Sequence, residues 1–184
     1  MSEPPTVAGI LTADELLYLH LPDKQTELVR GELIVREPAG YRHGVVASKI
    51  ARLIANHVHD HGLGIVVAAE TGFKLSSNPD TVRAPDVGFL SHDRAPDPPP
   101  VGYPSLAPDL AVEVLSPSDR AGEVQSKVSD WLNAESRLVW VLDPGRRRAI
   151  IYRADGSVDV LGEHDALDGE DVLPGFACSL AEVW

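Results

Sequence analysis

The chain has 184 residues, of which 43% are hydrophobic, and this predicts one folded domain with a substantial core rather than a disordered chain. Its formal net charge of −12 means that any contact with nucleic acid must depend on a local basic surface or on bound metal ions. No apolar run approaches the roughly 18 residues of a membrane span, and the first residues lack the pattern of a signal peptide. The single cysteine, Cys178, excludes an internal disulfide framework and fits a reducing cytoplasm.

Apolar periodicity and turn residues predict the elements of the first half of the chain. In chain order these are a loose leader over residues 1–11, a short helix after Thr12, a β-hairpin over 27–37 turning at Arg30-Gly31, a helix over 45–61, a strand over 63–75 bent at Gly72, and a strand over 87–90. The first helix opens on a capping box of Thr12 and Glu15. Gly62 is a natural end for the second helix.

The second half predicts a parallel strand pair joined by a helix. Its elements are a proline-rich loop over 94–104, a strand over 109–115, a helix over 119–134, a strand over 138–142, a hairpin over 147–161, and an irregular C-terminal strap anchored by Leu173, Phe176, Leu180 and Trp184. The unit over 109–142 is typical of a βαβ crossover, and the hairpins beside it imply a mixed sheet. The predicted class is α/β, or α+β on a looser definition, in a single domain spanning residues 1–184.

The apolar strand over 109–115 contains one carboxylate, Glu113. A charge in a buried strand is costly unless a partner or a metal neutralises it. Asp86 follows a proline at the entry of another apolar strand, so the two carboxylates can converge if these strands are neighbours. Together with the backbone carbonyl of Val114 they would suit Mg²⁺, which binds through few carboxylates and keeps several waters.

Lys127 lies on the helix that follows the Glu113 strand, one turn after Glu123. If it folds back over the strand end, its ammonium would stand beside the metal and stabilise negative charge during phosphodiester hydrolysis. Simpler interpretations remain open for each residue taken alone. Asp86 fits a turn or cap, Glu113 could face water, and Glu123 with Lys127 fits a surface pair at i,i+4 spacing.

The other reactive residue types point to no second site. His57 and His61 have zinc-ligand spacing on one helix, but no third ligand is evident. His43 fits an acid–base group, a phosphate contact or a helix cap, and Cys178 fits a buried packing position. The run Arg146–Arg148 fits a solvated loop or a phosphate contact. Walker and GxGxxG motifs are absent from the sequence, so nucleotide binding has no support.

The chain also resembles a known family through a set of short motifs. These are Arg83-Ala-Pro-Asp86-Val, Pro108-Asp-Leu-Ala-Val-Glu113-Val-Leu-Ser-Pro117-Ser-Asp119 with the later Lys127, and Trp140-Val-Leu-Asp143-Pro144. They resemble the Uma2 family of restriction-endonuclease-like proteins, within the PD-(D/E)XK nuclease superfamily. The resemblance extends from Thr12 to the Leu180-Ala-Glu-Val ending.

The resemblance implies a restriction-endonuclease-like fold, a mixed β-sheet flanked by helices, in a homodimer that cuts nucleic acid, most simply DNA, with Mg²⁺ or Mn²⁺. Asp86 would match the motif aspartate and Glu113 the motif acid. The superfamily's lysine is expected two residues after that acid, where this chain has Leu115, so the resemblance moves that role to Lys127. Glu32 and His43 would match the family's early acidic and histidine positions in the same pocket.

Two other functions fit the same residues. One is a catalytically silent binding or assembly domain that retains the nuclease fold, which the net charge and the displaced lysine favour. The other is a metal-dependent phosphoesterase acting on a small phosphorylated substrate, which would suit an acidic protein better than DNA does.

Overall fold

The computed structural model describes residues 10–184, so most of the leader expected over residues 1–11 lies outside the described residues. Leu11 is described, and its N–H donates to the Gly31 carbonyl at 2.8 Å. From Ile10 onward, none of the helices combines the length and hydropathy needed to cross a membrane.

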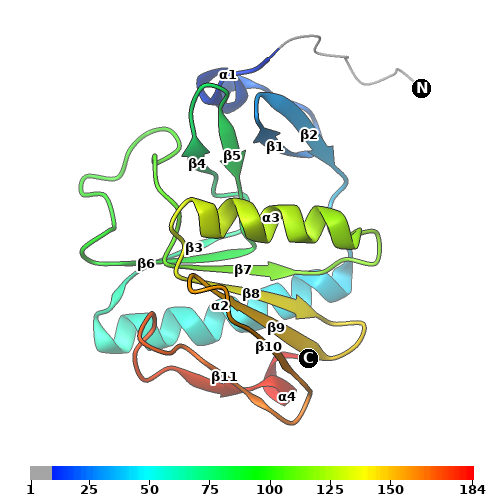
Figure 1. The fold of residues 1–184 in the computed structure, drawn as a ribbon, viewed down its shortest axis with the longest axis vertical. Helices are drawn as coiled ribbons and strands as arrows, with labels where there is room; N and C mark the ends of the chain where they lie inside the picture. Colours follow the sequence, from blue (N-terminus) through cyan, green and yellow to red (C-terminus); the bar gives the residue numbers. More distant parts are fainter. Residues whose placement is uncertain (1–9) are drawn as a thin grey trace.

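A six-stranded mixed sheet forms the centre of the molecule, in the order β10-β9-β8-β7-β6-β3 (Figure 1). Its strands are β3 (Gly64–Ala68), β6 (Val87–Ser91), β7 (Leu110–Val114), β8 (Leu138–Asp143), β9 (Arg148–Arg153) and β10 (Val158–Leu161). β7 and β8 are parallel and are joined by helix α3 (Ala121–Asn133), whereas the other neighbouring strands are antiparallel. The predicted βαβ crossover and mixed sheet are therefore confirmed.

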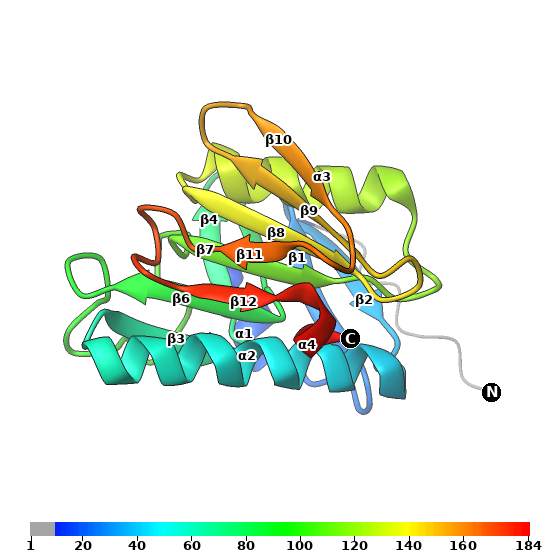
Figure 2. The ribbon, with the colours of Figure 1, turned by 90° about the horizontal axis from the view of Figure 1, so that it is seen from below.

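The two long helices cover opposite faces of this sheet. Helix α2 (Tyr41–His61) lies on one face and α3 on the other (Figure 2). Side chains alternate along β7, so Val112 and Val114 pack in the core on the α2 side and Ala111 packs on the α3 side. Glu113 shares the Ala111 side. The alternation thus directs the carboxylate of this strand toward α3.

A smaller sheet, in the order β2-β1-β5-β4, adjoins the central one. It contains β1 (Gln25–Val29), β2 (Glu32–Arg36), β4 (Phe73–Ser76) and β5 (Thr81–Arg83), and helix α1 (Ala13–Tyr18) packs on it. Thr12 and Glu15 form the predicted capping box, and Gly31 takes a φ of +80° at the predicted hairpin turn.

One predicted strand is two strands in different sheets. The expected strand over residues 63–75 ends at Ala68 and the chain resumes as β4 at Phe73. A turn separates them, with Glu70 at a φ of +69°. At Gly72 a Cβ atom would come within 2.5 Å of the Tyr103 ring, so the absence of a side chain allows the close approach. The interruption of the apolar residues by Glu70-Thr71-Gly72 marks a change of sheet rather than a bend within one strand.

The C-terminal strap contains regular structure that the sequence pattern missed. Residues 166–183 form a short antiparallel pair, β11 (Ala166–Asp168) and β12 (Ala177–Ser179), followed by helix α4 (Leu180–Val183). These elements are only three or four residues long, too short for periodicity to reveal them. Cys178 is buried, as predicted, and burial raises the pKa of its thiol to about 11.

Candidate active site

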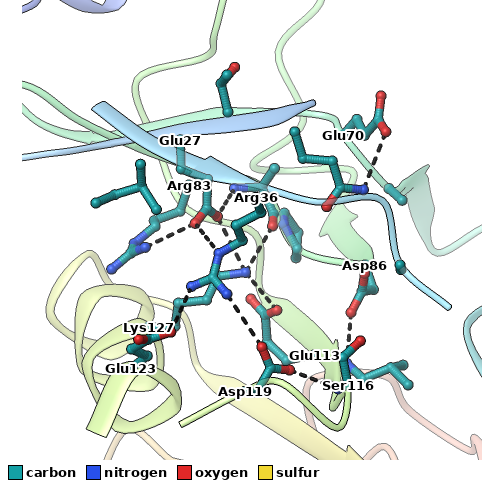
Figure 3. Close-up of a pocket in the computed structure, with 18 of the residues that line it drawn as sticks. Glu27, Arg36, Glu70, Arg83, Asp86, Glu113, Ser116, Asp119, Glu123 and Lys127 are labelled. Carbon is teal, nitrogen blue, oxygen red and sulfur yellow. Dashed lines mark hydrogen bonds and ion pairs between the residues drawn. The ribbon is translucent and has the colours of Figure 1, made fainter. Parts of the chain in front are cut away.

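The carboxyl end of β7 opens into a cleft of about 880 Å³ between the two sheets (Figure 3). Its walls come from the β1–β2 hairpin, the start of α2, the segment before β6, the end of β7 and the face of α3. Five of the six predicted site residues line it: His43, Asp86, Glu113, Val114 and Lys127.

Asp86 is fixed at the point where the chain enters β6. Its N–H donates to the Val112 carbonyl at 3.0 Å. Its Oδ2 accepts a hydrogen bond from the Val114 N–H at 2.7 Å and lies 3.2 Å from His43 Nε2. Because the N–H and C=O of a strand residue point to the same side, the Val114 carbonyl also faces the Asp86 side of the strand. Asp86 and the end of β7 are therefore joined directly.

Lys127 returns to the strand end as predicted. Its Nζ donates to Glu113 Oε2 at 2.8 Å and to the Ala84 carbonyl at 3.3 Å. The second oxygen of Glu113, Oε1, accepts from the Trp131 indole at 2.8 Å. Lys127 and Trp131 lie one turn apart on α3, so a single helix face holds both oxygens of the β7 carboxylate.

Burial and neighbouring charge shift the protonation of this pair. Burial raises the pKa of Glu113 to about 7 against the opposing effect of the Lys127 ammonium, and the nearby Asp86 carboxylate adds to the rise. Burial alone would lower the pKa of Lys127, but the Glu113 and Glu27 carboxylates outweigh it and raise that pKa. Lys127 is thus a permanent cation beside a carboxyl group that titrates near neutral pH.

His43 lies at the first turn of α2 and faces Asp86. The hydrogen bond to Asp86 raises the pKa of His43, burial opposes the rise, and the charges of Asp86 and Asp119 support it. His43 therefore orients Asp86, and the acidic surroundings favour its protonated form.

Glu27 on β1 is a site residue that the sequence reasoning missed. It is 5% exposed, and its carboxylate lies 2.9 Å from Arg83 Nη1 and 3.3 Å from Lys127 Nζ, while accepting from the Ala84 N–H at 3.1 Å. Burial alone would raise the pKa of Glu27, but Lys127 and Arg83 outweigh it and lower that pKa. Glu27 thus ties the lysine of α3 to the segment that carries Asp86.

Glu32, the early acidic residue predicted for this pocket, lies outside it. In the hairpin register Glu32 pairs with Val29 at the turn end, whereas Glu27 pairs with Ile34 inside the cleft. The shift of two residues along the strand amounts to about 7 Å, and it leaves Glu32 exposed. The spacing of Gln25 and Glu27 places both on one face of β1, but the sequence carries no signal that this face meets the cleft.

Glu27→Gln is expected to lower the free energy of unfolding by about 3 kcal/mol at pH 7, because it leaves buried cations without their carboxylate. Because folding lowers the pKa of Glu27, its carboxylate stabilises the protein at pH values above its unfolded pKa of 4.5. This stabilisation is lost as the pH falls through the lower pKa of the folded state. The difference from the wild type should therefore shrink on acidification below about pH 4. Urea unfolding at several pH values measures this, with the exposed Glu32→Gln as the matched control, and equal midpoints for both variants at pH 7 would refute the assignment.

The cleft contains oxygen donors that could hold a metal ion. From Ile10 to Trp184, no group of three or more His, Cys, Asp or Glu side chains is arranged to hold a metal. Mg²⁺ needs only one or two carboxylates and fills its remaining positions with water. Both hydrogen bonds to Asp86 fall on Oδ2, and within the described chain Oδ1 accepts none. Asp86 Oδ1, Glu113 and the Val114 carbonyl are hard oxygen donors of the required kind.

The remaining candidates of the sequence have other partners. The rings of His57 and His61 stack at 4.3 Å, and His57 Nε2 lies 2.9 Å from the Pro174 carbonyl oxygen. The arginines of residues 146–148 form ion pairs with Asp143 and Glu163. Neither group lines the cleft.

Comparisons with known proteins give this chain a family and a fold. A family model described as "Uma2: Putative restriction endonuclease" matches residues 13–181. A search of curated proteins found no match. Among solved structures, a protein from Anabaena variabilis ATCC 29413, described as "a putative nuclease belonging to DUF820", is similar with a TM-score of 0.81 and 20% identity, over 94% of this chain and 97% of that one. At this identity the structural match establishes a shared fold.

Proposed function

Because the chain belongs to the Uma2 family, a family of restriction-endonuclease type, we propose that it is a Mg²⁺- or Mn²⁺-dependent endonuclease that hydrolyses phosphodiester bonds in nucleic acid, most simply DNA. The observation that carries the proposal is that the entry to β6, the carboxyl end of β7 and helix α3 meet at one place. Asp86 bonds the Val114 N–H at 2.7 Å, and Lys127 bonds Glu113 at 2.8 Å. Two carboxylates, a carbonyl and a lysine are the groups that metal-assisted phosphodiester hydrolysis needs.

Asp86 and Glu113 would hold the metal, with the Val114 carbonyl as the third protein ligand. When bound, the ion polarises the phosphate and lowers the pKa of water. His43 keeps Asp86 in place through its contact at 3.2 Å. Burial raises the pKa of Glu113 to about 7, and a carboxyl group must lose its proton to bind a metal, so we expect metal binding to strengthen as the pH rises through neutral.

Lys127 would stabilise the negative charge that develops on the phosphate. Its contacts with Glu113, Glu27 and the Ala84 carbonyl fix the ammonium before substrate arrives, and such preorganised charge is effective in a site that excludes water. Glu27 is a positioning residue in this scheme, since it acts through Lys127. In this scheme Lys127 on α3 takes the role of the lysine that is expected two residues after Glu113, where this chain has Leu115.

Metal-dependent cleavage of labelled DNA tests the proposal. Incubation with Mn²⁺ or Mg²⁺ is expected to yield fragments, and excess chelator is expected to stop the reaction. RNA and a small phosphodiester serve as parallel substrates. Turnover of the small ester without cleavage of DNA or RNA would favour the small-substrate phosphoesterase, and failure on every substrate with either metal would favour the silent domain. The homodimer implied by the family resemblance stays a prediction, which sedimentation can measure.

A further inference from the structure

Arg36, the last residue of β2, extends into the cleft among three carboxylates (Figure 3). Its Nη1 lies 3.3 Å from Asp119, its Nη2 lies 3.7 Å from Glu123, and its Nε lies 3.8 Å from Glu27. Charge-assisted bonds of arginine normally measure about 2.7–2.9 Å, so all three contacts are loose. Arg36 belongs to none of the motifs identified in the sequence.

The guanidinium has hydrogen-bonding capacity that the described residues do not use. Nε is buried and has no hydrogen-bond partner within the described chain, although the side chain as a whole is 29% exposed. A buried donor without an acceptor is costly, so the guanidinium gains free energy if it moves to an arrangement that gives its donors acceptors. Arginine presents a planar fork that suits the oxygens of a phosphate.

The other long cations of the cleft are already committed to carboxylates. Arg83 is 4% exposed and bonds Asp130 at 2.6 Å and Glu27 at 2.9 Å, and Lys127 bonds Glu113 at 2.8 Å. Lys24 pairs with Glu37. Among the lysines and arginines that line the cleft, Arg36 therefore combines solvent access with the weakest attachment to its partners.

We propose that Arg36 binds a phosphate group of the nucleic acid strand in the cleft, leaving Asp119 and Glu123 when the substrate enters. The inference rests on the proposed function. It adds that the substrate carries phosphate groups and that one of them contacts β2. It also gives this protein of net charge −12 a local cation with which to attract a polyanion. Glu123 then acts as a competitor for the guanidinium in the free protein.

Binding of a fluorescein-labelled oligonucleotide, followed by anisotropy with Ca²⁺ in place of Mg²⁺, tests Arg36 separately from cleavage. Arg36→Gln is expected to weaken binding roughly 10-fold and to lower the slope of log affinity against log salt by about 0.7–0.9, the loss of one phosphate contact. Arg36→Lys should recover only part of the affinity, because lysine lacks the fork. Arg30→Gln, an exposed arginine of the same hairpin outside the cleft, is the matched control and should change affinity less than about twofold.

Glu123→Gln separates a phosphate-binding role from a structural bridge between β2 and α3. Release of Arg36 from this competitor should tighten binding several-fold, and the gain should vanish in the Arg36→Gln background. If Arg36 instead forms a structural bridge, Glu123→Gln should weaken oligonucleotide binding, and that result would overturn the inference. A gain in affinity that persists in the Arg36→Gln background, or a wild type that does not bind the oligonucleotide, would also overturn it. If the expected binding pattern holds but no cleavage occurs with Mg²⁺ or Mn²⁺, the proposed nuclease function alone fails.

Discussion

Glu113→Gln is expected to lower the rate of metal-dependent cleavage by about 1000-fold or more, since it removes a charged metal ligand at the reacting phosphate. The change keeps the shape of the side chain and an oxygen that can accept from the Trp131 indole or the Lys127 ammonium. Stability at pH 7 should remain within about 1 kcal/mol of the wild type, because burial raises the pKa of Glu113 to about 7 and its ionised form therefore adds little stability there, unlike that of Glu27. Cleavage rates and urea midpoints on the same preparations measure both effects.

Asp109→Asn is the matched control for this variant. Asp109 is also a buried acid, directly before β7, but it bonds the Ser91 N–H and Arg94 at 2.8 Å and does not line the cleft. Its variant should lose stability and keep its cleavage rate per folded molecule. A Glu113→Gln variant that cleaves as fast as Asp109→Asn would contradict the assigned role of Glu113.

Lys127→Ala is expected to lower the cleavage rate by about 100- to 1000-fold, the usual effect of removing one group that stabilises the transition state. It should also lower the free energy of unfolding by about 3 kcal/mol, because Glu113 and Glu27 lose a buried partner. Since Lys127 lowers the pKa of Glu113, that pKa should rise above its value of about 7 in the variant. The residual activity should therefore require a higher pH than that of the wild type.

Lys74→Ala distinguishes the loss of catalysis from the loss of an ion pair. Lys74 bonds Asp80 at 2.9 Å with both side chains largely covered, and it lies outside the cleft. We expect reduced stability with an unchanged rate from this variant. If Lys127→Ala also loses stability but keeps the cleavage rate of the wild type at every pH measured, Lys127 is a structural residue and the proposed chemistry is wrong.

The sequence predicted the central βαβ unit because its elements carry strong local signals. Two long apolar runs identify the strands β7 and β8, and the helical spacing of apolar residues identifies α3. The crossover that follows from this order of elements is confirmed. Glu113 stood out there as a charge in a buried strand, and the structure brings it to Lys127. The division of residues 63–75 between two sheets was missed because the short break at Glu70-Thr71-Gly72 fits a bend in one strand as well as a turn between two.

Glu27 and Arg36 were missed for a different reason. Both lie on a hairpin whose alternating pattern does not reveal which strand end meets the cleft. Glu32 was selected because it begins a strand beside the turn, yet the register leaves it exposed and displaced from Glu27 by about 7 Å along the hairpin. Contacts between residues far apart in the sequence, such as Arg83 with Glu27, decide this part of the site.

A crystal soaked in Mn²⁺ and measured at an anomalous wavelength tests whether Asp86 and Glu113 bind the metal. We expect one metal peak about 2.0–2.2 Å from oxygens of Asp86, Glu113 and the Val114 carbonyl, with the Lys127 ammonium near the metal. The same soak of Asp86→Asn should lose the peak. A wild-type crystal with no peak at these oxygens, or with a peak only at other residues, would contradict the assignment of Asp86 and Glu113 as the metal-binding pair.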